Sequence, residues 1–367
     1  MWKYFDLLPL RSRRNVVSLG EGGTSLISSN RLAARLGVKK LRLKNDTTNP
    51  TGSHKDRQIS VTISKAKELG RSKVSTASSG NVGASVAAYS ARAGFICIVL
   101  VPSIASPEKL VQIKMYGANV IRVETESNIA VAEILKSIAD EFGLFNIVTA
   151  GSHNPYTLEG GRTIAFEIFE QYNRNLPDTI ITPVGGGGLV GSLWTGLKDL
   201  VQLGLVDGLP RIIGVQARGC APFVEAIRKQ LSAEEALKSP WSGRIETICE
   251  AIADTIPLDA RTAIPAITES KGTAIAVPDT DILKAQRELA ALEGIFAEPS
   301  SCTVIAALND LLNDGTLKRY EEILCVITGS GLKSIKKISK LLPESRMAKP
   351  SLDSVSKVVR ETLLHRL

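Results

Sequence analysis

Lys55 is the side chain whose position in the sequence most favours covalent chemistry. It lies in residues 49–57 (NPTGSHKDR), between a predicted strand and a predicted helix. Asn-Pro and Thr-Gly favour turns, and the dipole of the following helix disfavours the ammonium form of a lysine at its N-terminus. A neutral amine is the form that attacks a carbonyl group. The segment is also typical of an ordinary loop with a solvated lysine, so other motifs must decide.

A glycine-rich loop suggests that an anion is bound. Residues 183–189 (PVGGGGL) follow a predicted strand and precede a predicted helix. Glycines allow successive backbone amides to converge on one anion, and the N-terminus of the next helix adds partial positive charge. We therefore favour a phosphate-binding loop over a flexible turn.

The same loop also matches the dinucleotide pattern G-x-G-x-x-G, through Gly186, Gly188 and Gly191. A nicotinamide enzyme would carry an acidic residue after the next strand, where it binds the ribose. Residues 216–218 are Gln, Ala and Arg. Their chemistry argues against a nicotinamide oxidoreductase.

Two short polar segments also follow predicted strands. Residues 78–81 (SSGN) open a helix, and residues 328–333 (TGSGLK) end an apolar strand. Each alone is typical of a helix cap or a turn. Because α/β proteins bind ligands at the carboxyl ends of parallel strands, the Asn81 amide and the Thr328 hydroxyl are candidate ligand contacts.

The elements that must position these residues alternate along the chain. Short β-rich runs alternate with segments of helical period, which predicts a parallel sheet covered by helices on both faces. The predicted strands are residues 41–43, 74–77, 95–101, 118–124, 145–149, 179–184, 211–216 and 323–328. Residues 218–271 show a less regular pattern, and we expect surface helices and loops there. Apolar residues from Leu352 to Leu367 recur on one helical face, which predicts a tail that packs on the body or on a partner subunit.

Composition excludes several classes of protein. The 367 residues exceed one ordinary domain, and a net charge of +8 comes with only 5% aromatic residues, which argues against nucleic acid as a partner. Five separated cysteines indicate reduced thiols in a cytoplasmic protein, and three histidines leave a metal site almost without ligands. The most apolar run, residues 82–101, is interrupted by Arg92 and Gly94, so no membrane span is expected.

Together and in this order, the segments resemble the fold-type II (β-family) enzymes that depend on pyridoxal 5′-phosphate. Residues 19–26 (LGEGGTSL) and 297–301 (AEPSS) add to the resemblance, which runs from about residue 8 to residue 333. It implies an α/β fold of the tryptophan synthase β type, with two three-layer α/β domains and the cofactor in the cleft between them. We expect a large cofactor-binding domain of residues 1–70 and 151–340, a small domain of residues 71–150 and a helical tail of residues 341–367.

The resemblance also implies roles for individual residues. Lys55 would bind the cofactor covalently and carry protons, Asn81 would contact its 3′-oxygen, and Thr328, rather than Ser330, would meet its pyridine nitrogen. A neutral hydroxyl at that nitrogen suits elimination and replacement better than transamination. The cofactor phosphate would be held by Gly185, Gly186, Gly187, Gly188 and Leu189. Candidate substrate-binding residues are Ser78, Ser79, Lys109, Ser152 and Asn154. Many family members are dimers, so a homodimer is one option.

Within this family the chain is most similar to threonine synthases. Residues 2–10, 154–156 (NPY) and 328–333 carry that similarity. The implied reaction converts O-phospho-L-homoserine, an amino-acid substrate, and water into L-threonine and phosphate. Val82 and Thr157 depart from the pattern, because a threonine and an arginine are usual there. Both positions are expected to help hold the substrate phosphate.

Alternatives within and beyond this reaction stay open. Four glycines followed by Leu189 look more like threonine and serine dehydratases, and His54 replaces the usual phenylalanine, as in the tryptophan synthase β chain. These features favour a threonine or serine dehydratase (ammonia-lyase), or a β-replacement enzyme acting on serine or phosphoserine. A third alternative is a catalytically silent protein that binds the cofactor or regulates others.

Overall fold

The computed structural model describes residues 1–339, 342 and 344–364, and its chain divides into two compact units, Met1–Lys333 and Ser334–Leu367. The first unit holds two β-sheets. The second holds α13 (Ile335–Ser339) and α14 (Leu352–Leu364). No helix among the described residues combines the length and apolarity needed to cross a bilayer.

The larger sheet has the strand order β1-β2-β10-β7-β8-β9. Its strands are β1 (Leu26–Ser28), β2 (Lys40–Asn45), β7 (Thr179–Pro183), β8 (Arg211–Ala217), β9 (Thr273–Val277) and β10 (Glu322–Ile327). All neighbouring strands are parallel except β1, which pairs antiparallel with β2. The central strands are buried nearly throughout, as continuous apolar runs covered on both faces require.

The smaller sheet has the order β5-β4-β3-β6, with all neighbours parallel. It contains β3 (Lys73–Ala77), β4 (Ile96–Pro102), β5 (Asn119–Val123) and β6 (Phe145–Asn146). These strands lie between β2 and β7 in the chain. The exact domain boundaries stay predictions, and the expected boundary at residues 340 and 341 lies outside the described residues.

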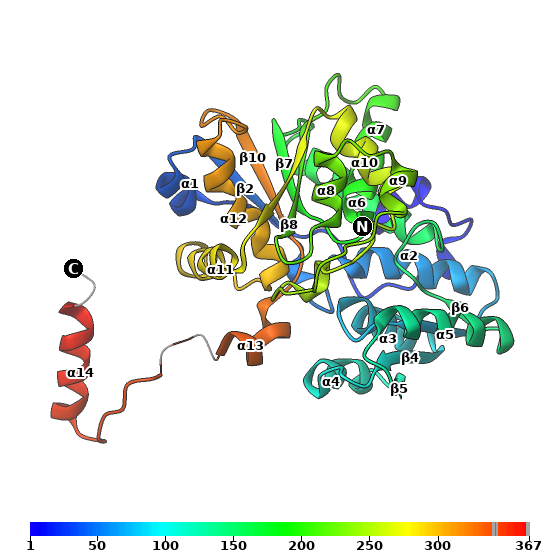
Figure 1. Ribbon diagram of the computed structural model, residues 1–367, viewed down its shortest axis with the longest axis horizontal. Helices are drawn as coiled ribbons and strands as arrows, with labels where there is room; N and C mark the ends of the chain where they lie inside the picture. Colours follow the sequence, from blue (N-terminus) through cyan, green and yellow to red (C-terminus); the bar gives the residue numbers. More distant parts are fainter. Residues whose placement is uncertain (340–341, 343, 365–367) are drawn as a thin grey trace. The chain divides into compact units, whose positions relative to one another are not determined.

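Helices cover both sheets (Figure 1). The helices of the first unit are α1 (Asn30–Leu36), α2 (Lys55–Glu68), α3 (Asn81–Ala93), α4 (Pro107–Met115), α5 (Asn128–Glu141), α6 (Tyr156–Gln171), α7 (Gly188–Gln202), α8 (Pro222–Arg228), α9 (Ala233–Leu237), α10 (Ala260–Glu269), α11 (Asp279–Glu293) and α12 (Pro299–Asn313). Short 3-10 helices are η1 (Trp2–Leu7), η2 (Arg13–Asn15), η3 (Asp46–Thr48), η4 (Glu250–Ile252) and η5 (Gly331–Ser334).

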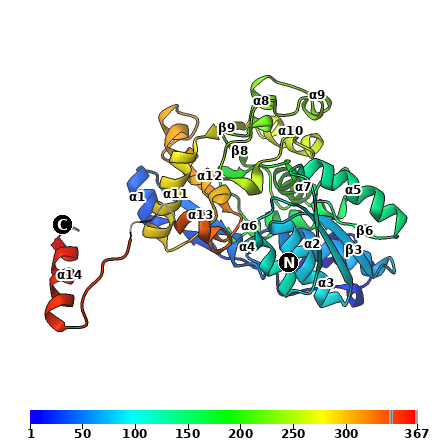
Figure 2. The same cartoon turned by 60° about the horizontal axis from the view of Figure 1, so that its bottom comes forward.

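The larger sheet has a separate hydrophobic core on each face. One core joins its strands to α1, α11 and α12, and the other joins them to α6, α7 and α10. Figure 2 shows α11 and α12 on one side of β8 and β9, with α7 and α10 on the other. A third core lies around the smaller sheet. Helix α2 packs against both α6 and α3, so its first residue, Lys55, lies where the two sheets and their helices meet.

Residues 218–271 contain the helices α8, α9 and α10 joined by loops, as the sequence predicts. The elements differ from the sequence expectations in two places. Strands β1 and β9 were not predicted. Strand β1 has only three residues, too few to show alternation. Strand β9 (TAIAV) contains small alanines, which also suit a helix. Strand β6 covers only Phe145–Asn146, not the expected residues 145–149.

Helix α14 carries the apolar face that the sequence indicates. Leu352, Val355, Val359 and Leu363 are all exposed, Leu352 at 83%. Leu367 lies outside the described residues. The expected packing of this tail on the body or a partner therefore stays a prediction.

Candidate active site

The turn before Lys55 is bonded to the end of β10. His54 N donates to Thr328 O at 2.8 Å, and Ser330 N donates to Gly52 O at 2.9 Å. Gly52 has a φ of +83°, which favours glycine over residues that carry a Cβ atom. These bonds join Lys55 and Thr328, two sequence-predicted site residues whose segments lie far apart in the chain.

The Lys55 amine lies in an unusual environment. Among the residues that the structure describes, it has no hydrogen-bond or ion-pair partner, although three carboxyl groups are near it: Asp254, Asp259 and Glu298. Burial lowers the pKa of Lys55 and outweighs the opposite effect of these carboxylates. A larger share of molecules then carries the neutral amine, which is the nucleophilic form.

The carboxyl groups near Lys55 are perturbed in the opposite direction. Burial raises the pKa of Glu298 and Asp254 above the ordinary range, and raises the pKa of Asp259 to about 6. In the described part of the chain, no three acidic, His or Cys side chains are grouped to hold a metal ion. The raised pKa values make the protonated form of these carboxyl groups more common than it is in water.

The glycine-rich loop passes directly against this cluster. Gly187 caps α7 with a φ of +101°, and no side chain caps the helix, which leaves backbone N–H groups of its first turn available for an anion. A Cβ atom on Gly185 would lie 2.5 Å from Asp254 Oδ2, and one on Gly188 would lie 2.8 Å from Asp259 Oδ2. A residue with a Cβ atom at either position would therefore displace one of these carboxylates.

Asn81 and Thr328 lie at the carboxyl ends of two different strands. Asn81 is the first residue of α3, and its Nδ2 donates to both oxygens of Glu298, at 3.1 and 3.2 Å. Thr328 follows β10 and is buried, with its hydroxyl 2.8 Å from Ser301 Oγ. Glu298 N donates to Gly329 O at 2.9 Å, which ties the two regions together.

These residues fit pyridoxal phosphate on three points. The unpaired Lys55 amine can bind a carbonyl carbon, the uncapped α7 with its glycines can receive a phosphate, and the Thr328 hydroxyl can meet a ring nitrogen. The structure brings Lys55 close to the glycine loop and to Thr328. The assignment of each residue to an atom of the cofactor stays a prediction.

The candidate substrate-binding residues differ in how buried they are and in whether they already have partners. Ser78 and Ser79 lie half-buried in the loop before Asn81. Lys109, on α4, forms an ion pair with Glu250, so its charge is already matched. Ser152 is exposed, and its hydroxyl lies 3.0 Å from His153 Nδ1.

Asn154 differs from the other candidates because its side chain is buried without partners. Only 3% of it is exposed, and among the described residues neither Nδ2 nor Oδ1 has a hydrogen-bond partner. Gly151 N, in the same segment, donates to Asp259 Oδ1 at 2.6 Å. This bond links the Asn154 segment to the cluster around Lys55, and a buried unpaired amide is a ready contact for a ligand.

Val82 and Thr157, the two positions that depart from the threonine synthase pattern, carry no charged side chain. Val82 is half-buried beside Asn81. Thr157 is buried, and its hydroxyl donates to Asn154 O at 2.8 Å. Neither residue supplies a cation for a substrate phosphate.

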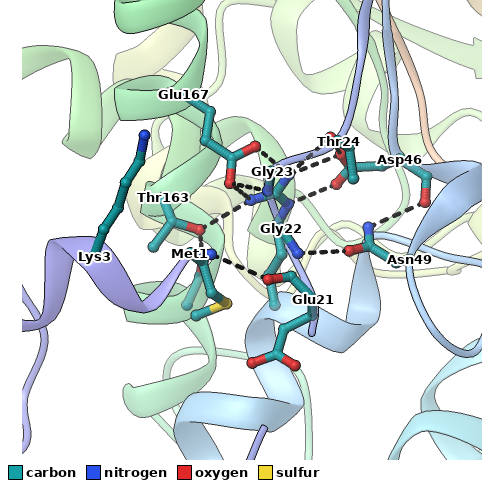
Figure 3. Close-up of polar contacts among 12 residues, drawn as sticks. Met1, Lys3, Glu21, Gly22, Gly23, Thr24, Asp46, Asn49, Thr163 and Glu167 are labelled. Carbon is teal, nitrogen blue, oxygen red and sulfur yellow. Dashed lines mark hydrogen bonds and ion pairs between the residues drawn. The ribbon is translucent and has the colours of Figure 1, made fainter. Parts of the chain in front are cut away.

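Sequence reasoning missed a buried ion network beside the site. Arg57 donates to Asp46 and to Glu167, each at 2.7 Å, and Lys44 Nζ donates to Glu167 at 2.8 Å. Burial alone would raise the pKa of Glu167, but Arg57 and Lys44 lower it. Figure 3 shows Glu167, Thr24 and Asp46 converging on this network. Its members come from four separate segments, so no local motif marks them.

The same region connects the segment 19–26 to the lysine-bearing turn (Figure 3). Gly22 N donates to Asn49 Oδ1 at 2.9 Å, and Asn49 Nδ2 donates to Asp46 O at 3.0 Å. Asp254 and Asp259 were also missed, because they lie in the stretch with a less regular pattern. Glu298 and Lys333 stood in quoted motifs but were given no role.

Most of this chain is similar in sequence to known proteins. The family described as pyridoxal-phosphate dependent enzyme matches residues 17–329. Threonine synthase from Methanocaldococcus jannaschii is 44% identical over 334 residues, covering 91% of this chain and 80% of that protein. Threonine synthase from Methanosarcina acetivorans is 38% identical, covering 98% and 86%. Threonine deaminase isoform 2 from Solanum lycopersicum superposes with a TM-score of 0.74 at 20% identity, covering 94% and 93%, which shows a shared fold alone.

Proposed function

This chain belongs to the family of pyridoxal-phosphate dependent enzymes, and we propose that it is a threonine synthase, a lyase that converts O-phospho-L-homoserine and water into L-threonine and phosphate. The observation that carries the proposal is 44% identity to a threonine synthase over 91% of the chain. This reaction would serve threonine biosynthesis.

The proposed site distributes the cofactor among separate elements. Lys55 binds its carbonyl carbon, the amides of residues 185–189 hold its phosphate, Asn81 contacts its 3′-oxygen, and Thr328 contacts its ring nitrogen. When bound, pyridoxal phosphate supplies an electron sink that stabilises negative charge on the substrate carbons. The unpaired Lys55 amine, the uncapped N-terminus of α7 and the buried Thr328 hydroxyl support these assignments.

Lys55 also carries protons in this proposal. Elimination of phosphate requires protons to leave the α and β carbons of the substrate. Formation of threonine requires protons to return to the γ and α carbons, while the water that adds at the β carbon gives up a proton. The lowered pKa of Lys55 lets its amine accept a proton, and Asp259, with a pKa of about 6, lies close enough to influence that exchange.

The substrate would be bound by two loops and by helix α4 beside the cofactor. We assign it to Ser78, Ser79, Lys109, Ser152 and Asn154. The buried, unpaired amide of Asn154 supports this most directly, whereas Lys109 would have to leave Glu250 to reach a phosphate.

A dehydratase or β-replacement enzyme, acting on threonine, serine or phosphoserine, is the second candidate. The observation that favours it is Thr157, which stands where an arginine is usual and whose hydroxyl is bonded to Asn154 O. A weaker phosphate site suits threonine or serine, whose leaving group is water.

A substrate comparison tests the proposal. Purified enzyme with pyridoxal phosphate is given O-phospho-L-homoserine, and phosphate and threonine are measured; parallel samples receive threonine or serine, and 2-oxo acid is measured. We expect phosphate and threonine in equal amounts, and none with Lys55→Ala. Oxo acid without phosphate release would establish a dehydratase instead, and activity in neither assay would favour a silent binder.

We also propose that the protein is cytoplasmic. A homodimer is the proposed assembly, and light scattering would test it. All five cysteines are free and buried, which suits a reducing compartment.

A further inference from the structure

The Asn81 side chain is held between two groups of opposite charge. Its Nδ2 donates to both carboxylate oxygens of Glu298, at 3.1 and 3.2 Å, and its Oδ1 accepts a hydrogen bond from Lys333 Nζ at 2.8 Å. Asn81 comes from the start of α3, whereas Lys333 lies 252 positions later. Three segments that are remote in sequence therefore meet at one side-chain amide.

The two neighbours impose the same orientation on that amide. A lysine ammonium can only donate hydrogen bonds, so it can face Oδ1 but not Nδ2. An ionised carboxylate can only accept them, so Glu298 can face Nδ2 but not Oδ1. Nδ2 carries two hydrogens, and one remains for a ligand when the other is bonded to Glu298.

We propose that Lys333 is a positioning residue that fixes the Asn81 amide with Nδ2 toward the 3′-oxygen of the cofactor. The inference rests on the proposed function in one respect: it assumes that Asn81 contacts the 3′-oxygen of the cofactor. It assigns a role to a lysine outside the residues that touch the cofactor.

Lys333 is itself held in place by the turn before Lys55. Its Cε lies 3.3 Å from the position that a Cβ atom on Gly52 would occupy. The aliphatic part of the Lys333 side chain therefore passes directly against Gly52. The charged groups that face Lys333 are Glu298, beside α12, and Asp56, on α2. Burial lowers the pKa of Lys333, while these two carboxyl groups raise it.

Removal of the lysine charge has two expected consequences. Without a donor at Oδ1, the amide can rotate and present Oδ1 to the 3′-oxygen, where two acceptors repel each other. Loss of a nearby positive charge also makes the deprotonated form of the bound cofactor less stable, which raises the pH at which it deprotonates.

The experiment compares Lys333→Met with Lys333→Arg and with Lys229→Met, a surface lysine paired to Glu225 on α8. Two quantities are measured: the Kd for pyridoxal phosphate, and the pH midpoint of the visible absorption of the bound cofactor. We expect Lys333→Met to raise the Kd about tenfold, the loss of one charge-assisted hydrogen bond, and to raise the midpoint. Lys333→Arg keeps a cationic donor and restores most of both values, and Lys229→Met changes neither.

Unchanged Kd and midpoint in a folded Lys333→Met variant would overturn the inference. If that variant does not fold, Lys333→Gln replaces it, because a neutral glutamine can present either end of its amide and so no longer selects one orientation of Asn81. A smaller shift of both quantities in the same direction supports the inference, and no shift contradicts it. Neither the Kd nor the pH midpoint depends on threonine formation. Both can therefore be measured even if the protein does not catalyse the proposed reaction.

Discussion

Two cations on the first turn of α2, Lys55 and Arg57, lie in opposite electrostatic environments. Arg57 is 1% exposed and donates hydrogen bonds to Asp46, Glu167 and neighbouring hydroxyls. Lys55 has carboxyl groups nearby but, within the described residues, no hydrogen bond or ion pair. The paired cation keeps the start of the helix in position, and the unpaired one is left available for chemistry.

The charges around Arg57 balance, whereas those around Lys55 do not. Arg57 and Lys44 face two carboxylates, Asp46 and Glu167, whose pKa values are lowered by this pairing against the effect of burial. Around Lys55, burial raises the pKa of each carboxyl group. A fully paired buried network fixes geometry more than it adds stability. An unpaired network keeps groups whose pKa values are displaced from their ordinary ranges.

The largest effect is expected from removal of the unpaired cation. Lys55→Ala should lower the rate of phosphate release from O-phospho-L-homoserine on the order of a thousandfold or more, because the covalent anchor and the proton carrier are lost together. Borohydride treatment followed by peptide mapping should label Lys55 in the native enzyme and nothing in the variant. A variant that stays active, with the label on another lysine, would refute the comparison.

Removal of the paired cation should act on stability. Arg57→Met leaves Asp46 and Glu167 buried with too little positive charge, and we expect the free energy of unfolding to fall by about 3–5 kcal/mol in urea titrations. The matched control is Arg35→Met, because Arg35 pairs with Glu288 on the surface at 2.7 Å. That change should cost less than about 1 kcal/mol. Equal losses in the two variants would show that the buried network has no special role.

A smaller effect is expected from Asp259, whose pKa burial raises to about 6 from an ordinary 3.8. Between these two pH values the folded protein binds more protons than the unfolded chain, so stability should fall as pH rises from about 4 to 6. Asp259→Asn keeps an acceptor for Gly151 N and should remove this loss, about 3 kcal/mol at pH 7. The measurement is the urea midpoint of the cofactor-free protein against pH.

The opposite result would place Asp259 in a different environment. If native protein and Asp259→Asn lose or gain stability in parallel from pH 4 to 7, the carboxyl group titrates as it does in the unfolded chain. The contrast between the paired charges around Arg57 and the unpaired charges around Lys55 would then be weaker than we infer.

Several features of the fold were predictable because their signals are local. Apolar runs such as β10 and the apolar period of α2 predicted a parallel sheet with helices on both faces. Strand β9 was missed because its alanines give a weak signal, whereas helices within residues 218–271 were expected without exact bounds. Without those bounds, nothing in that stretch placed Asp254 and Asp259 near Lys55.

The sequence by itself determined the type of chemistry: a lysine at the start of a helix, a loop of glycines after a strand, and a hydroxyl at the end of another strand. Each depends on neighbours along the chain, so each can be read from short motifs. Only the tertiary structure decided which charges meet. It left Lys55 unpaired, buried Arg57 among carboxylates, and held Asn81 between Glu298 and Lys333, because packing brings together segments that are as many as 252 positions apart.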